Sequence, residues 1–588
     1  MPSISRRDLL RSGLAVSVSS LAIGTATRAT ALLAGYPFGA AEISSAVAPR
    51  ERLLFDFGWK FFQGHGSDPR RDLGFGMGQG DFAKSGEFEF STSKFDDSKW
   101  RALDLPHDWA IELPFLYDEE QNSHGYKPLG RRYPETSIGW YRRTLDIPKE
   151  DEGRRISVEF DGAFRSALMF LNGYFIGRND NGYAPFCFDL TDFINFGGKN
   201  YLVVRMDASF GDGWFYEGAG IYRHVWLTKT DALHLARWES TVRTTMRGNA
   251  VVLTLGTVVQ NEGKEPESYQ VHWRILDATG KTVTAATAHG AVEAGGSKEQ
   301  KGDISVPDPA LWSPETPNLY TAVATVESAG KTRDAERITF GVRDIKWDAD
   351  KGFFLNGKSV KIKGTCNHQD HAGVGAALPD RLQAYRLAVL KDMGGNAVRT
   401  SHNMPSPEWV EACDRMGMMM MCETRLMSSN PEGMAQLEVM IKRYRNSPSI
   451  ILWSMGNEEW TMMPQSQGIR VIDDMIARTH QLDPTRMCSA AVNDAFKTGF
   501  PEQLDVMGFN YNLTVIDDWH KTHPKIPSVG SETASTVCTR GIYSTDKLRN
   551  WVSAYDANHP EWAELAEEWW KFYACLLYTS DAADDLTR

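Results

Sequence analysis

The chain has 588 residues, which exceeds the usual size of one domain and predicts three or four domains, each with its own core. Hydrophobic residues make up 42% and charged residues 24%, so a disordered chain is excluded. The net charge is −12, and no long basic run is present. We therefore expect no nucleic acid or anionic membrane partner, and a neutral or small polar substrate instead. The 18 tryptophans could stack on sugar faces, although such rings more often anchor cores.

The N-terminus carries an export pattern. Arg6 and Arg7 precede a modestly apolar stretch, residues 13–24, and small residues continue to position 31. The stretch is too short and too rich in Ser and Thr to span a bilayer, and no later segment offers about 18 consecutive apolar residues. The pattern resembles a bacterial twin-arginine signal, with a disordered basic tail as the alternative. We expect residues 1–31 to be the signal, residues 32–50 a leader or linker, and the location to be periplasmic or extracellular.

Two β-rich blocks come next. Residues 51–230 hold short alternating runs separated by Gly and Asn turns, which predicts a jelly-roll β-sandwich. Residues 231–340 hold strands at the spacing of a seven-stranded sandwich, which predicts an immunoglobulin-like domain. The seven cysteines are scattered and form no C-x-x-C pair, so they indicate neither a disulfide framework nor a zinc site.

Residues 341–574 change rhythm, because short apolar runs now alternate with helical segments. This pattern predicts a (β/α)8 TIM barrel that lacks its last strand. Strands are expected at residues 360–364, 397–400, 418–423, 450–453, 487–491, 506–510 and 528–531. Helices are expected at residues 381–393, 406–416, 432–444 and 469–482. In such a barrel the chemistry lies where strands end and βα loops begin.

Two carboxylates stand at such strand ends. Glu458 follows the fourth strand, next to Asn457, and Glu532 ends the seventh. Glycoside hydrolysis needs one carboxylic acid to protonate the leaving oxygen and a second carboxylate across the anomeric carbon. A single strand-end Glu is more often an ion-pair partner, but two on one face with an adjacent Asn favour catalysis.

Further polar residues follow other strands of the same barrel. His368 follows the first strand, Arg399 and His402 the second, and Asn510 and Tyr511 the sixth. Such groups could bind sugar hydroxyls and hold a nucleophilic carboxylate ionised. Each His alone is better explained as an ordinary loop residue, and the spacing of His368 and His371 is only a weak metal signal.

From about residue 50 to 574 the chain resembles glycoside hydrolase family 2, the β-galactosidase and β-glucuronidase family. The motifs that carry the resemblance to its sugar-binding jelly roll are Leu171-Asn-Gly173, Phe188-Asp-Leu190 and Gly220-Ile-Tyr-Arg-His-Val-Trp226. In the barrel, Asn457-Glu458 is similar to the acid/base signature, and Glu532 stands at the nucleophile position.

The resemblance also implies roles for the neighbouring side chains. It assigns Asn457 to the sugar 2-hydroxyl and places Tyr511 and Arg399 beside Glu532. His368 and His402 would line the sugar subsite, and Asn510, which follows the sixth strand, is a further substrate-binding candidate. Asp207 falls where some members reach a loop into the barrel, and we include it among the substrate-binding candidates.

The sequence departs from the family pattern in two places. Members with magnesium place a Glu and a His after the third strand, whereas this chain has Glu423-Thr-Arg425, so we expect no metal or cofactor. Residues 575–588 resemble translated adapter sequence and are predicted to be non-native. A barrel without its eighth strand leaves two unpaired strand edges, so the chain as written is expected to fold poorly and to be inactive.

The expected function is that of a retaining exo-β-glycosidase of β-galactosidase type. Residues 423–427 and the segment around Glu532 look closer to that branch than to the glucuronidases. A β-glucuronidase or another family 2 exo-glycosidase is the alternative. A carbohydrate-binding protein that has lost catalysis would be expected to lack one of the two carboxylates. The expected partner is a glycoside, oligosaccharide or polysaccharide, and self-association into a homo-oligomer is left open.

Overall fold

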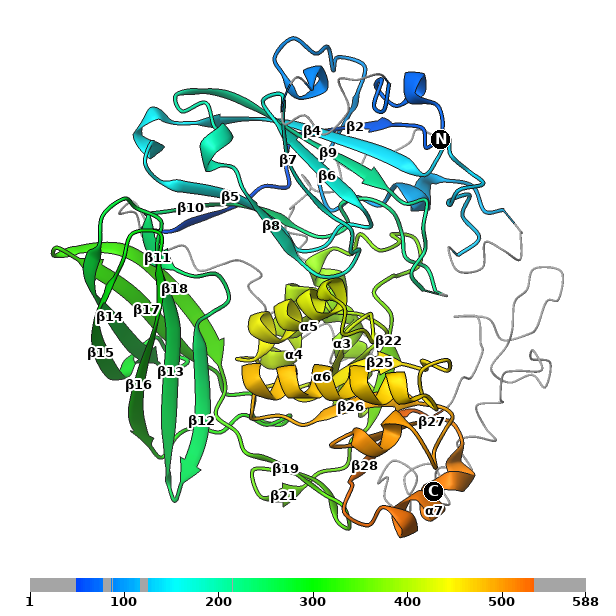
Figure 1. Ribbon diagram of the computed structural model, residues 1–588. Helices are drawn as coiled ribbons and strands as arrows, with labels where there is room; N and C mark the ends of the chain where they lie inside the picture. The colour runs from blue at the N-terminus through cyan, green and yellow to red at the C-terminus, as the bar shows by residue number, and fades with distance from the viewer. Residues whose placement is uncertain (1–48, 78–85, 87, 117–124, 214, 534–588) are drawn as a thin grey trace, which may run out of the picture.

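The computed structural model describes residues 49–77, 86, 88–116, 125–213 and 215–533. Two β-sandwiches and a barrel of parallel strands follow one another along the chain (Figure 1). In the view of Figure 1 the first sandwich lies above the barrel and the second lies beside it. This is the multidomain architecture expected from the sequence.

The first sandwich consists of two antiparallel sheets around an aromatic core. One sheet has the order β1-β10-β5-β8, and the other β3-β2-β4-β9-β6-β7. The strands are β1 (Glu51–Leu54), β2 (Trp59–Gln63), β3 (Arg101–Leu103), β4 (Ile138–Ile147), β5 (Arg155–Phe160), β6 (Ala167–Leu171), β7 (Tyr174–Asn179), β8 (Phe186–Asp189), β9 (Gly198–Asp207) and β10 (Val225–Thr230). Trp59, Trp109 and Tyr141 are almost completely buried between the sheets, and such large rings stabilise a sandwich by the area they bury.

The second sandwich contains eight strands within residues 233–340, not the expected seven. β13 is flanked by β11, β12 and β16, and the facing sheet has the order β15-β14-β17-β18. The strands are β11 (Leu233–Leu235), β12 (Thr241–Arg247), β13 (Ala250–Asn261), β14 (Glu267–Leu276), β15 (Thr282–Val292), β16 (Ser297–Pro307), β17 (Tyr320–Ser328) and β18 (Lys331–Phe340). The extra strand, β11, has three residues and pairs with the end of β13, so it is too short to leave an alternating pattern.

The barrel strands pair in sequence order, and every pair is parallel. They are β22 (Gly364–Asn367), β23 (Ala397–Thr400), β24 (Met419–Glu423), β25 (Ile450–Asn457), β26 (Cys488–Val492), β27 (Met507–Asn510) and β28 (Ser528–Glu532). The helices are α3 (Asp380–Asp392), α4 (Pro407–Met416), α5 (Pro431–Tyr444), α6 (Ser466–Leu482) and α7 (Ile516–Thr522). The seven strands nearly close the barrel, since the thiol of Cys366 on β22 donates to the carbonyl of Ser531 on β28 at 3.3 Å. The predicted tail at residues 575–588 lies outside the described residues.

The first barrel strand starts later than the sequence suggests. The alternating residues 360–363 were expected to be strand, but β22 begins at Gly364. A small antiparallel sheet precedes it, formed by β19 (Ile345–Asp348), β20 (Gly352–Leu355) and β21 (Lys358–Ser359). Val360 and Ile362 pack with this sheet against the underside of the barrel. Their alternation therefore reflects packing below the barrel and not membership of its wall.

A buried arginine joins the first sandwich to the barrel. Arg223, from the motif that precedes β10, donates to the carbonyl of Met404 at 2.8 Å and to the side-chain oxygen of Gln369 at 3.2 Å, both on barrel loops. It also donates to the carbonyl of Tyr183 within the sandwich at 2.9 Å. Because one guanidinium satisfies carbonyls of both domains, its removal would leave several buried acceptors unpaired.

A buried carboxylate makes a second link between these two domains. Asp108 accepts hydrogen bonds from the backbone N–H groups of Ala110 and Ala219 in the sandwich and of Ala376 in the barrel, each at 2.9 Å. Tyr216 donates to the same carboxylate at 2.7 Å. The loop that contains Tyr216 is thereby held against the barrel.

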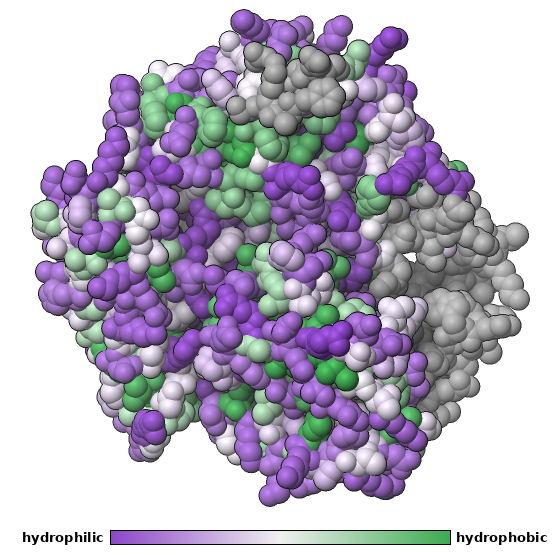
Figure 2. Space-filling view, in the orientation of Figure 1, coloured by the Kyte–Doolittle hydropathy of each residue, from purple (hydrophilic) through white to green (hydrophobic). Residues whose placement is uncertain are grey.

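Hydrophilic side chains cover most of the face shown in Figure 2, and hydrophobic side chains form small separate groups on it. In the described part of the chain, no helix has both the length and the apolar character that a membrane crossing requires.

We predict that Arg223→Ala lowers the free energy of unfolding by about 2–4 kcal/mol, because buried carbonyls in both domains lose their donor. Urea unfolding followed by tryptophan fluorescence measures the change. Arg178→Ala is the control, since Arg178 is an exposed side chain in a surface ion pair, and it should cost less than about 0.5 kcal/mol. Equal effects of the two substitutions would contradict the role given to Arg223.

Candidate active site

The carboxyl ends of the barrel strands bring most of the predicted site residues together. Arg399, Asn457, Asn510 and Glu532 stand on β23, β25, β27 and β28. Glu458 and Tyr511 follow directly after their strands, and His368 and His402 lie in the loops after β22 and β23. Ring contacts join the two histidines, with centroids 5.2 Å apart.

A buried ion pair lies at the base of the site. The Arg399 guanidinium donates from Nε to Oε2 of Glu423 at 2.8 Å and from Nη2 to Oε1 at 2.9 Å, a bidentate arrangement. The Glu423 side chain is fully buried. Burial favours its neutral form, but the Arg399 charge and the hydrogen bond with His402 outweigh this and lower the pKa of Glu423 to about 2. The pair is therefore charged at neutral pH.

Arg399 also connects this pair to the predicted catalytic residues. Its Nη1 donates to Oε2 of Glu532 at 3.2 Å, and its Nη2 to Oδ1 of Asn457 at 2.6 Å. Tyr511 donates its hydroxyl to the other oxygen of Glu532. Both oxygens of Glu532 are thus contacted, one by a cation and the other by a phenol, which fixes the orientation of the carboxyl group.

Glu458 has a different environment. Burial is the main cause that raises the pKa of Glu458, and the negative charge of Glu532 adds to it, whereas the hydrogen bond from Asn510 opposes both. Its backbone φ is +54°, a left-handed conformation that costs a non-glycine residue about 1–2 kcal/mol. Such strain is concentrated at functional sites. A carboxyl with a raised pKa retains its proton more readily and suits a general acid.

The amide of Asn510 lies between the two carboxylates. Its Nδ2 donates to Oε1 of Glu458 at 2.8 Å and to Oε2 of Glu532 at 3.2 Å. These two oxygens are therefore at most about 6 Å apart. Ser531 donates to Oδ1 of Asn510 at 2.7 Å, which fixes the orientation of the amide. Retaining glycosidases place their carboxyl groups about 5–5.5 Å apart and inverting ones about 6.5–9.5 Å apart, so the geometry favours retention.

Two buried polar atoms at the site have no hydrogen-bond partner among the described residues. They are Nδ2 of Asn457 and Nδ1 of His368. Burial, followed by the charges of His402 and Arg399, lowers the pKa of His368 to about 3, so its ring is neutral at working pH. A buried amide donor left without an acceptor is costly, and a substrate hydroxyl would satisfy it.

A loop of the first sandwich also reaches the site. The ring of Phe215 lies 4.9 Å from the ring of His368 and 6.0 Å from that of His402, measured between centroids. Arg425, after β24, donates to the carbonyl of Asp212 in the same loop. Phe215 is not among the residues predicted from the sequence, because no local pattern distinguishes it from other sandwich aromatics.

The side-chain contacts of Asp207 are with residues of the first sandwich. Asp207 ends β9, accepts a hydrogen bond from the backbone N–H of Ser209 at 2.9 Å and lies 3.7 Å from Arg205, both in the sandwich. The barrel contacts of this loop are made by Asp212 and Phe215 instead. A substrate contact of Asp207 stays a prediction.

Comparison with known proteins gives the same three-domain order. The sugar binding domain of glycosyl hydrolases family 2 matches residues 87–231, the family's second domain residues 234–343, and its TIM barrel domain residues 348–436 and 428–541. The chain belongs to glycosyl hydrolases family 2. It is 32% identical to the beta-galactosidase BoGH2A of Bacteroides ovatus, over 90% of this chain and 66% of that protein.

Other family 2 relatives and solved structures are also similar. A beta-glucuronidase of Formosa agariphila is 25% identical over 86% of this chain and 54% of its own length. The crystal structure of a family 2 member from Bacteroides cellulosilyticus gives a TM-score of 0.74 at 31% identity, covering 82% of this chain and 62% of that chain. The chain thus spans about half to two thirds of the length of these relatives.

Glu423, the last residue of the third barrel strand of this family 2 chain, already has hydrogen-bond partners on both carboxylate oxygens. Each oxygen of Glu423 has two partners, since Arg399 contacts both, His402 lies 2.9 Å from Oε1, and Ser454 donates to Oε2 at 2.7 Å. A carboxylate in this state has no lone pair left for a cation. Magnesium prefers several oxygen ligands in octahedral geometry, and the donor set here does not fit it.

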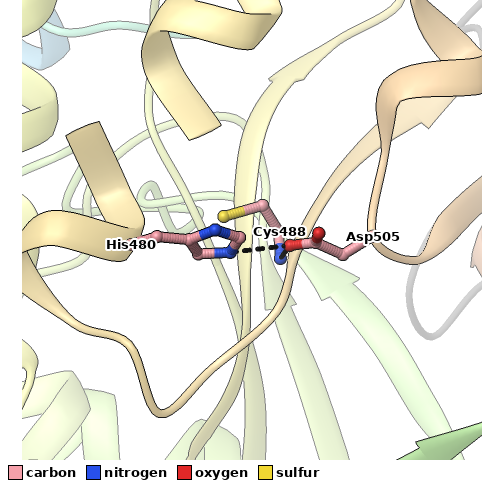
Figure 3. A group of neighbouring side chains, drawn as sticks. All are labelled: His480, Cys488 and Asp505. Carbon is pink, nitrogen blue, oxygen red and sulfur yellow. Dashed lines mark hydrogen bonds and ion pairs between the residues drawn. The ribbon is translucent and has the colours of Figure 1, made fainter. Parts of the chain in front are cut away.

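Two other groups in the described residues bring together possible metal ligands, and neither includes a predicted catalytic or substrate-binding residue. The first group is His480, Cys488 and Asp505, whose possible ligand atoms lie within 4.8 Å of one another (Figure 3). His480 is on α6, and Cys488 and Asp505 lie at the amino-terminal ends of β26 and β27, opposite the ends that carry the predicted site. His480 and the backbone N–H of Cys488 both contact Oδ2 of Asp505, at 2.8 Å and 2.7 Å. Burial raises the pKa of the Cys488 thiol well above its usual value, so the thiol keeps its proton.

The second group is His224 with Asp380 and Glu408, where the sandwich meets α3 and α4. Burial disfavours the charged imidazole, yet the hydrogen bonds with Asp380 and Asp56 raise the pKa of His224 to about 11. The imidazolium itself supplies the positive charge that these carboxylates need. Both groups are explained by ion pairs and hydrogen bonds.

We predict an acid-dependent stability term from Glu423. Its folded pKa of about 2 is below the ordinary 4.5, so its stabilisation is complete above pH 4.5 and is lost as the pH falls through 2. At neutral pH the lowered pKa of Glu423 contributes about 3 kcal/mol to the free energy of unfolding. The free energy of unfolding of Glu423→Gln should therefore fall furthest below that of the wild type above pH 4.5. This difference between the two proteins should shrink by about 2 kcal/mol at pH 3.

Urea unfolding at several pH values between 5 and 3 measures this gap. Glu411→Gln is the control, because Glu411 forms an exposed ion pair with Arg415 on α4 and should give the wild-type pH dependence. A gap for Glu423→Gln that does not change with pH would contradict the charged pair.

We also predict that activity survives chelation. Because the lone pairs of Glu423 are engaged by Arg399, His402 and Ser454, exhaustive EDTA treatment of a version extended by an eighth βα unit should change its kcat/KM by less than about twofold. A large loss that only magnesium restores would show that the site after β24 binds this ion.

Proposed function

We propose that the protein is a retaining exo-β-glycosidase that acts on terminal β-linked sugars, most closely of β-galactosidase type. The observation that carries the proposal is the shared contact of Asn510 with Glu458 and Glu532, which limits the distance between their oxygens to about 6 Å. This spacing suits a covalent glycosyl-enzyme intermediate and is too short for an intervening water on the inverting route.

The proposed reaction has two displacements. Glu532, which accepts hydrogen bonds from Arg399 and Tyr511, attacks the anomeric carbon while Glu458 donates its proton to the leaving oxygen. The bond from carbon to the leaving group breaks as the bond to the Glu532 carboxylate forms. Glu458, now ionised, then takes a proton from water, whose oxygen attacks the anomeric carbon and releases Glu532.

The sugar is proposed from the relatives. The most extensive similarity given above is to a beta-galactosidase, at 32% identity over 90% of this chain. A β-glucuronidase is the second candidate, because proteins of that name are similar over much of the chain. A structure of Bacteroides uniformis beta-glucuronidase 2, 26% identical, is described as covalently bound to cyclophellitol-6-carboxylate aziridine, which supports a nucleophilic mechanism in the family. A panel of nitrophenyl glycosides distinguishes the two sugars.

Azide rescue tests the two roles. Glu458→Ala should retain its first step on a substrate with an activated aryl leaving group, which needs no protonation, and azide should restore turnover with a β-glycosyl azide as product. Glu532→Ala should lose about 10⁴-fold or more, and any azide product should be the α-anomer. Product anomers are read by NMR.

Glu459→Ala is the matched control, because Glu459 is a half-buried neighbour of Glu458 with a raised pKa of similar cause. It should show neither azide product. Since the relatives are longer than this chain, the assays use the chain and a version extended by the next βα unit of the 32%-identical relative. Azide products of the reversed anomeric pattern would contradict the assignment.

Export is also proposed. Arg6 and Arg7 with the apolar stretch that follows support twin-arginine transport to the periplasm or the medium. Replacing both arginines by lysine and measuring the location of the protein by fractionation tests this, and unchanged export would contradict it.

A further inference from the structure

We propose that Trp460 forms the binding platform for the leaving-group sugar, so that it selects saccharide over non-saccharide leaving groups. This inference rests on the function proposed above and concerns the position of the leaving group. The ligand class is a pyranose residue of an oligosaccharide, bound through its apolar CH face.

The first observation is exposure. Trp460 has 64% of its side chain exposed, and the other tryptophans in the described residues are buried or half-buried. Tryptophan has a large apolar surface and is buried to a high degree on average, so an open ring in a folded enzyme is informative. Flat aromatic rings bind ligands by stacking, and a sugar ring has a CH face that matches them.

The second observation is position. Trp460 is two residues after Glu458, and its N–H donates to the Glu458 carbonyl at 2.8 Å. The general acid protonates the oxygen of the leaving group, so the leaving sugar must lie beside the residue that carries the proton. The loop that bears Glu458 therefore borders the leaving-group position, and Trp460 is the exposed aromatic side chain of that loop.

The third observation is rigidity. The N–H groups of Met462 and Met463 both donate to the Glu459 carbonyl at 2.9 Å, which closes a tight turn. Met463 is fully buried, and its carbonyl accepts the N–H of Phe500 at 3.1 Å. A platform on a fixed turn loses little conformational freedom when a ligand stacks on it, and this favours binding.

The test compares two leaving groups on the same glycosyl unit. Trp460→Ala should lower kcat/KM for a β-linked disaccharide about tenfold, mainly through KM, because the stacking contact is lost. The same variant should hydrolyse the glycosyl fluoride at the wild-type rate, since fluoride has no ring to stack. Trp460→Phe should recover much of the disaccharide activity. Phe57→Ala is the matched control, because Phe57 is 60% exposed on the first sandwich.

Saccharide binding by saturation-transfer NMR gives a readout that does not depend on turnover. Weaker binding of the leaving-group sugar by Trp460→Ala than by Phe57→Ala supports the platform. Equal loss on disaccharide and fluoride, or unchanged saccharide binding, would overturn it. If wild type hydrolyses neither substrate in either the chain or its extended version, the proposed function fails, and the NMR result alone decides on the platform.

Discussion

The arrangement of the catalytic face depends on one buried ion pair, Arg399 with Glu423. Their side chains come from adjacent strands, and the bidentate contact fixes the plane of the guanidinium. The N–H groups that remain on Arg399 then contact Asn457 and Glu532, so one cation on β23 contacts groups on three other strands. A lysine could not replace it, because a single ammonium lacks this planar fork. The cationic contact of Glu532, the proposed nucleophile, comes from the same arginine.

The two carboxylates differ because of how that charge is distributed. Glu532 accepts hydrogen bonds from the Arg399 cation and the Tyr511 hydroxyl. The side-chain donor to Glu458 is the neutral amide of Asn510. Two negative charges within about 6 Å disfavour each other, so the carboxyl without the cation takes the proton. This difference in environment is the basis for proposing Glu532 as the nucleophile and Glu458 as the acid.

The residues at the ends of the barrel strands could be predicted from the sequence, but the contacts between distant segments could not. The rule that barrel chemistry lies at the carboxyl ends of strands selected Glu458, Glu532, Arg399 and Asn510, and the structure brings them into contact. Glu423 obeys the same rule, but its partner could not be chosen without the strand pairing. Phe215 reaches the site from another domain, and such a contact leaves no local period in the sequence. Residues 360–363 misled for a related reason, since packing under the barrel produces the same alternation as a strand.

The first sandwich is part of the site and not only its neighbour. Arg223 and Asp108 bind backbone groups of barrel loops, and the segment that Asp108 holds through Tyr216 also carries Phe215 to the two histidines. A loop gains precision when its ends are fixed by buried hydrogen bonds, because its own conformational freedom is then small. The sandwich–barrel interface therefore positions Phe215 against His368 and His402, the residues proposed to line the sugar subsite. A change at that interface would move Phe215 relative to His368 while leaving the carboxylates in place, so it should affect substrate binding before it affects bond cleavage.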